Sequence, residues 1–246
     1  MHHYHMITGK KQADYLDNVI ALRKQVWPDF IRVPDATILK LYEWYPDFQI
    51  SLFDCDTEEL IAIANAVPLI WHEPLAALSD QGVSWVLNEA LTQLIAATLS
   101  NFLCAVSISV AVNYRHQGLS EILLKQLKAI CKQHSLTQLV VPVRPSDKSR
   151  YPLIAIEDYL QWKNPEGLPF DPWLRTHIKL GARVIKLCEH SAMVTASVKT
   201  WEQWTGMYFP GDGAYLIKGA LNPIEINLKD NVGTYVEPNV WVQYLA

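Results

Sequence analysis

The segment VAVNYRHQGLS, residues 110–120, lies where an alternating apolar run changes to a helical one. Residues 103–112, which overlap the start of this segment, alternate between larger and smaller side chains. The larger set is Cys104, Val106, Ile108, Val110 and Val112, and the smaller set is Ala105, Ser107, Ser109 and Ala111. A period of two predicts a strand with one core face and one face of small residues that permits close approach. After the segment, leucine and isoleucine recur at helical spacing over residues 119–134, which predicts an amphipathic helix.

The next apolar run, QLVVPV (Gln138–Val143), predicts a second strand. Two strands joined through a helix are expected to be parallel, with a right-handed crossover. Pro142 cannot donate a hydrogen bond to a ladder, so one side of this strand should be unpaired there. We therefore predict two parallel strands that splay apart at their carboxyl ends.

The loop between strand and helix is a candidate anion site. Backbone N–H groups at a helix N-terminus lie at the positive end of the helix dipole and bind phosphates. Gly118 permits close backbone approach, Ser120 adds a hydroxyl group and Arg115 supplies a positive charge. The pattern is neither GxGxxG nor the Walker loop, so a Rossmann or P-loop nucleotide site is not indicated. An ordinary turn with a solvated arginine is the alternative interpretation.

Composition excludes several classes of function. Of the 246 residues, 50% are hydrophobic and 19% are charged, and the formal net charge is -4. This balance gives no electrostatic footprint for nucleic acid or an anionic membrane, so we expect neither as a partner. The uncharged stretch over residues 90–114 contains many polar side chains, and we interpret it as a helix end followed by a strand.

The cysteines and the first residues bear on location and metal binding. The four cysteines show no metal-ligand spacing, and we interpret them as reduced thiols. The start, MHHYHMITGKK, lacks the apolar core of a signal peptide, so we expect a cytoplasmic location. We interpret His2, His3 and His5 as surface residues and expect no metal.

The remainder of the chain contains no linker rich in glycine or serine and no repeat. Helices are expected over residues 156–162 and 172–180, the second ended by Gly181, and Asp171 is a candidate helix cap. Strands are expected near residues 184–187, 192–198, 215–221 and 240–245. We predict a single domain over residues 1–246, with a core over about 1–190 and an aromatic-rich C-terminal part over about 190–246.

Residues 110–120 resemble the acyl-CoA-binding motif of the GNAT superfamily of N-acyltransferases. Val110, Tyr114, Arg115 and Gly118 match that motif, and Ser120 stands where the family usually has glycine or alanine. The resemblance implies an α/β fold with a mixed sheet whose central parallel strands splay. It also implies acetyl-CoA or a related acyl-CoA as co-substrate.

The same resemblance assigns roles to individual residues. The backbone of Val110 and Val112 would pair with the pantetheine arm, and Arg115 belongs to the same motif. The amide groups that would hold the pyrophosphate are those around His116, Gln117, Gly118 and Ser120.

A second resemblance concerns the chemistry. Many GNAT enzymes carry a helix motif Tyr-x-x-Leu-Gly-Phe, whose tyrosine protonates the leaving thiolate. The corresponding stretch here is HIKLGA, so His177 stands at the tyrosine position. Histidine can donate a proton or act as a base near neutral pH. The alternative is a partly buried histidine that forms a local hydrogen bond.

The resemblance implies transfer of an acetyl group from acetyl-CoA to a primary amine of a small molecule or peptide. One alternative is a GNAT-like malonyl-thioester decarboxylase or S-acyltransferase. GNAT-like loading domains of polyketide assembly lines are associated with these reactions and also have an active-site histidine. The strand here offers Val141 and Val143 where those domains have a threonine. The other alternative is a non-catalytic acyl-CoA-binding module. Arg144, Lys148 and Arg150 are further candidates for contact with a phosphate or an acidic acceptor, or else belong to a solvated loop.

Overall fold

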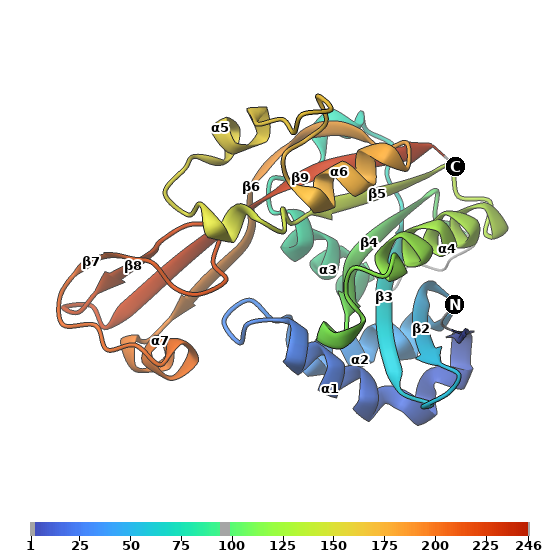
Figure 1. The fold of residues 1–246 in the computed structure, drawn as a ribbon, viewed down its shortest axis with the longest axis horizontal. Helices are drawn as coiled ribbons and strands as arrows, with labels where there is room; N and C mark the ends of the chain where they lie inside the picture. Colours follow the sequence, from blue (N-terminus) through green and yellow to red (C-terminus); the bar gives the residue numbers. More distant parts are fainter. Residues whose placement is uncertain (1–2, 94–98, 246) are drawn as a thin grey trace.

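The computed structural model describes residues 3–93 and 99–245, which form one open mixed sheet with helices packed against it (Figure 1). The strands are β1 (Tyr4–Thr8), β2 (Gln49–Asp54), β3 (Leu60–Leu69), β4 (Phe102–Val110), β5 (Gln138–Val143), β6 (Arg183–Ala196), β7 (Gly213–Tyr215), β8 (Ile224–Asn227) and β9 (Val232–Leu245). The α-helices are α1 (Leu16–Val26), α2 (Asp35–Trp44), α3 (Gly82–Gln93), α4 (Leu119–Gln133), α5 (Ile156–Gln161), α6 (Pro172–Lys179) and α7 (Val198–Thr205).

The strand order is β1-β2-β3-β4-β5-β9-β8-β7, with β6 also paired to β9. β4 and β5 form the parallel pair, joined through α4 as expected, and the other pairs are antiparallel. The predicted mixed sheet with a strand, helix, strand unit at its centre is therefore confirmed. Of the uncharged stretch over residues 90–114, residues 94–98 lie outside the described residues.

β4 ends earlier than the alternating pattern predicts. The strand expected to reach residue 112 stops at Val110, and Val112 lies in a short 3₁₀ helix (Val112–Tyr114). The partner strand β3 begins at Leu60, so the last ladder residues are Val110 opposite Ala62 and the Ala111 N–H that bonds to the Ile61 carbonyl. Alternation continues in the sequence past the point where a partner strand exists.

The C-terminal part differs most from expectation. The two strands predicted near residues 184–187 and 192–198 are one long strand, β6, with register shifts between Val184 and Lys186 and between Cys188 and Ala192. The strand predicted over residues 215–221 is wrong, because β7 ends at Tyr215 and the chain then turns toward Gly219, which has a positive φ. β8 and α7 were not predicted.

The outer parts of β6 and β9 form a ribbon that carries α7, β7 and β8, which together make a C-terminal lobe (Figure 1). Its small core is centred on the fully buried Trp201, whose indole N–H donates to the Gly233 carbonyl at 2.8 Å. Phe30, from the loop between α1 and α2, packs on Trp201 and Tyr235 of this lobe. The lobe therefore contacts the loop between α1 and α2 as well as the sheet.

Candidate active site

The central gap of the sheet lies between β4 and β5. The two strands pair at Leu103 with Leu139 and at Cys104 with Val140, and no pairing is recorded between them beyond Cys104 in the described residues. A β-bulge follows at once, because Ala105 pairs with Ala66 and Ser107 with Asn65, which leaves an extra residue in β4. A bulge bends a strand and disrupts its ladder.

β5 stays paired on its other side with β9 along its whole length, including Pro142 opposite Trp241. The unpaired side of β5 at Pro142 is therefore the side toward β4, as the proline predicted. β4 stays paired with β3, and β5 stays paired with β9, while β4 and β5 are no longer paired with each other. The predicted splay is therefore confirmed. Beyond Cys104 and Val140, the facing edges of β4 and β5 are therefore not paired with each other in the described residues.

The loop after β4 has the backbone of an anion site. Gly118 is the N-cap of α4 with a left-handed conformation (φ 78°), and no side chain of the described residues caps the helix start. A Cβ atom at this position would meet no heavy atom within 4 Å among residues 3–93 and 99–245, so glycine is required for its φ and not because space is short. His116 also has a positive φ, of 62°. Helix N-termini whose N–H groups lack a side-chain cap are suited to bind phosphates.

The residues that the motif singles out lie together around this loop. Val110 ends β4, and Arg115, His116, Gln117 and Gly118 are exposed, while Ser120 is half-buried in the first turn of α4. Val112 is 56% exposed, in the 3₁₀ helix rather than on the strand. Within the loop the side-chain contacts are long, at 3.5 Å from Arg115 Nε to the Val110 carbonyl.

His177 lies on α6, one turn before Gly181, as the sequence comparison with the family motif predicts. It is fully buried, and its Nδ1 atom is 2.7 Å from the Tyr244 hydroxyl. The ring of Trp173 packs edge-on at 4.4 Å between centroids. Burial lowers the pKa of His177 to about 3, so the imidazole is neutral at pH 7.

The position of His177 relative to the gap follows from the register. Tyr244 on β9 lies opposite Leu139 on β5, and Leu139 is one of the last residues paired with β4. His177 is thus level with the point where the gap begins. Its Nε2 atom is buried and has no hydrogen-bond partner in the described part of the chain. A buried ring nitrogen without a partner costs free energy, and a catalytic role is one of the explanations for such an atom.

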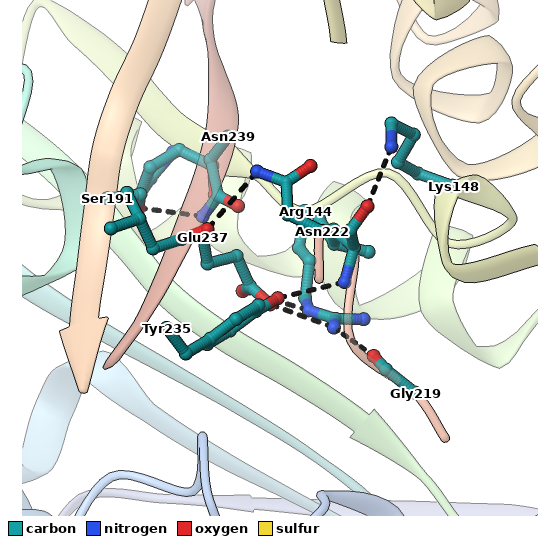
Figure 2. A network of polar contacts seen from close by, with 11 residues as sticks. Arg144, Lys148, Ser191, Gly219, Asn222, Tyr235, Glu237 and Asn239 are labelled. Carbon is teal, nitrogen blue, oxygen red and sulfur yellow. Dashed lines mark hydrogen bonds and ion pairs between the residues drawn. The ribbon is translucent and has the colours of Figure 1, made fainter. Parts of the chain in front are cut away.

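Arg144, which directly follows β5, belongs to a polar network and not to a solvated loop (Figure 2). Its guanidinium holds both carboxylate oxygens of Glu237 at 2.9 Å and donates to the Gly219 carbonyl at 2.6 Å. Burial alone would lower the pKa of Arg144, but Glu237 outweighs it and the pKa is raised. The Tyr235 hydroxyl donates to the same carboxylate at 2.7 Å.

Lys148 is likewise directed inward. It is fully buried and donates to the carbonyls of Leu221 and Tyr151, at 2.6 and 3.0 Å (Figure 2 shows the network around it). Burial lowers its pKa. Arg144 and Lys148 therefore join the C-terminal lobe to the end of β5, whereas Arg150 is exposed and pairs with Asp147.

The other sequence candidates have structural roles. Asp171 caps α6 by accepting from the Trp173 and Leu174 N–H groups, so the capping interpretation is confirmed. It also accepts from the Tyr159 hydroxyl at 2.9 Å.

No cluster of three or more histidine, cysteine, aspartate or glutamate residues suited to a metal occurs in the part of the chain that the structure describes. None of the described helices is long and apolar enough to cross a membrane.

Comparison with known proteins places these features in context. No protein-family model matches the sequence. A curated protein, arginine N-acetyltransferase avaD of Aspergillus versicolor, is 30% identical, and the match covers 88% of this chain and 84% of that protein. The loading GNATL domain of CurA from Lyngbya majuscula has a TM-score of 0.67 at 18% identity, covering 99% of this chain and 98% of that chain. The GphF GNAT-like decarboxylase in complex with isobutyryl-CoA has a TM-score of 0.59 at 19% identity, covering 99% of each chain. At these identities the two structures show a shared fold.

Proposed function

The chain belongs to the GNAT superfamily of acyl-CoA-dependent N-acyltransferases and is an N-acetyltransferase, and we propose that it transfers the acetyl group of acetyl-CoA to a primary amine of a cationic amino acid of the arginine type. The observation that carries the acyl-CoA part is the gap between β4 and β5, which leads to the uncapped start of α4. The acceptor class rests on the relative named as an arginine N-acetyltransferase, which matches most of this chain.

The residues of the loop would hold the co-substrate. The amide groups around His116, Gln117, Gly118 and Ser120 would bind the diphosphate, and the backbone of Val110 at the end of β4 would pair with the pantetheine arm. The carbonyl of Val112 accepts from the Arg115 N–H in the 3₁₀ helix, so strand-like pairing with the arm is proposed for Val110 alone. Support for this comes from the left-handed Gly118 and the open space beside it. Arg115 lies in the same exposed loop and adds positive charge.

Acetyl transfer forms a C–N bond, breaks the thioester C–S bond, removes one proton from the amine and delivers one proton to the thiolate. A neutral imidazole is a weak acid, so His177 would act as a hydrogen-bond donor rather than as a source of protons. If the Tyr244 hydroxyl donates to Nδ1, the proton of His177 resides on Nε2, the atom without a partner. We propose that this N–H stabilises the developing charge on sulfur.

The experiment measures release of free CoA thiol from acetyl-CoA with L-arginine, agmatine, L-lysine and Nα-acetylarginine as acceptors. We expect release that depends on the acceptor and is lost when the reacting nitrogen is blocked. Binding of acetyl-CoA without thiol release from any of these amines would reject the proposal and favour a non-catalytic binding module. Malonyl-CoA without an acceptor serves as a control, because its conversion to acetyl-CoA would identify a decarboxylase.

We also propose a cytoplasmic location. Cys104, Cys131 and Cys188 are buried as free thiols and Cys55 is exposed and free. Burial raises the pKa of Cys131 and of Cys188 to about 11, which keeps both thiols protonated and unreactive. This use of cysteine supports a reducing compartment.

A further inference from the structure

Three polar side chains form a row across strands β2, β3 and β4. Gln49 on β2, Asn65 on β3 and Ser107 on β4 are directly opposite one another in the strand register. Gln49 and Asn65 are fully buried, whereas Ser107 is half-buried. Uncharged polar groups are costly in an apolar core unless they are hydrogen-bonded. The row ends at β4, where the next strand, β5, has already separated.

The direction of every hydrogen bond in this row is determined at its buried end. The Gln49 amide nitrogen donates to the Tyr45 and Ala66 carbonyls, both at 2.9 Å, so its oxygen cannot be exchanged with its nitrogen without facing two carbonyls. That oxygen accepts from the Asn65 amide nitrogen at 3.0 Å. The Asn65 oxygen in turn accepts from the Ser107 hydroxyl at 3.0 Å.

The consequence is a serine hydroxyl that can only accept. Its single proton is committed to Asn65, and the two lone pairs of Oγ remain. A hydroxyl in this state can accept from an N–H donor but cannot donate a hydrogen bond to the lone pair of an attacking nitrogen.

Ser107 also borders the gap. It directly follows the bulge in β4, beyond the last residue paired with β5. Ser109, two residues further along the strand, projects from the same face and accepts from the Trp27 indole N–H at 2.8 Å. Trp27 directly follows α1, so this is the face of β4 that α1 covers.

We propose that Ser107 Oγ receives an N–H group of the acceptor amine and orients its nitrogen, with Asn65 and Gln49 acting as positioning residues behind it. This rests on the proposed acetyl transfer to an amine. A neutral amine attacks through its lone pair and must turn its N–H bonds away from the thioester carbon. An acceptor-only hydroxyl beside the gap holds the amine in that orientation.

The test compares Ser107→Ala with Ser51→Ala and Ser107→Thr. Ser51 on β2 is a matched control, because its buried hydroxyl also donates to a side-chain amide oxygen, that of Gln12 at 2.6 Å, but lies away from the gap. Three quantities are measured: the KM and kcat for L-arginine, or for the amine of the panel with the highest turnover; the affinity of that amine for the protein saturated with free CoA; and the Kd of acetyl-CoA.

We expect Ser107→Ala to lower both kcat/KM and the amine affinity about tenfold, the loss typical of one hydrogen bond to a polar or charged partner. The Kd of acetyl-CoA should not change, Ser107→Thr should restore most of the amine affinity, and Ser51→Ala should lower thermal stability alone. Equal amine affinity in Ser107→Ala and wild type, or an equal loss in Ser51→Ala, would overturn the assignment of Ser107. Failure of the proposed function itself is seen separately, as a wild-type protein that acetylates no amine.

Discussion

Burial lowers the pKa of His177 to about 3, and the Tyr244 hydroxyl lies against its Nδ1 atom. The unfolded chain has a histidine pKa of about 6.5. Between these two values the unfolded state binds a proton that the folded state does not. Protonation of His177 in the unfolded state therefore does not lower the free energy of unfolding above about pH 6.5. Below that pH, the free energy of unfolding decreases as the pH falls toward 3.

This linkage predicts that the free energy of unfolding falls by about 2 kcal/mol between pH 7 and pH 5 through His177 alone. His177→Gln and His177→Asn should both lack this part of the pH dependence. The measurement is urea denaturation at the two pH values. Wild-type slopes in both variants would show that the pKa of His177 is the same in the folded and the unfolded protein.

The same two variants separate the ring nitrogens. Asparagine retains a polar group near Nδ1 and has none near Nε2, whereas glutamine reaches the Nε2 position. If the Nε2 hydrogen bond assists sulfur departure, kcat falls about 10²-fold in His177→Asn and less in His177→Gln, with acetyl-CoA affinity unchanged in both. Equal kcat values in both variants and wild type would remove His177 from the chemistry.

Local spacing predicts individual residues where the partners are close in the sequence. His177 was found because Gly181 follows it by about one helical turn, and Gly118 because it lies between a strand and a helix. Asn65 and Gln49 were missed as partners of Ser107, since only the cross-strand register brings these distant residues together. Tyr244 was missed for the same reason.

At the scale of elements, the start of α4 is a helix terminus without a side-chain cap. Gly118→Ala forces a residue with Cβ into a left-handed conformation, which costs about 1 kcal/mol, and shifts the amides that would bind the diphosphate. We expect acetyl-CoA affinity to fall about tenfold or more.

Gly206 provides the matched control for this variant. It ends α7 in the lobe, has a φ of 66°, and a Cβ atom there would also meet nothing within 4 Å. Gly206→Ala should cause a similar loss of stability with normal acetyl-CoA binding. Calorimetry that found equal affinities for Gly118→Ala and Gly206→Ala would show that the loop does not bind the co-substrate.

Elements were predicted well where one periodicity coincides with one element. The amphipathic α4 and the apolar β5 meet this condition, and so does the gap, which follows from Pro142 and the parallel unit. The lobe was predicted poorly, because β7 and β8 are short and β6 is interrupted by register shifts that break its alternation. The bulge in β4 has no sequence signal of its own, since it depends on the register in which β4 pairs with β3.

At the scale of the whole molecule, the C-terminal lobe is joined to the sheet at the carboxyl end of β5. The joint contains the bidentate pair of Arg144 with Glu237, whose side chains are 18% and 3% exposed. Tyr235 in the lobe core donates to Glu237, and Gly219 accepts from Arg144, so one ion pair connects two parts of the lobe to the end of a central strand (Figure 2).

Removing one partner of such a pair leaves a buried charge without compensation, which typically costs about 3–5 kcal/mol, more than the pair itself contributes. We therefore expect Arg144→Met to lower the free energy of unfolding by this amount in urea denaturation, and Arg144→Met combined with Glu237→Gln to recover most of it, because glutamine still accepts from Tyr235. Lys179→Met, which breaks the exposed pair with Glu166, should have little effect. Amide hydrogen exchange should show faster opening of β7 and β8 in Arg144→Met, with β2 and β3 unchanged. Equal destabilisation of the single and double variants would mean that the packing of Arg144, not its charge, holds the lobe against the sheet.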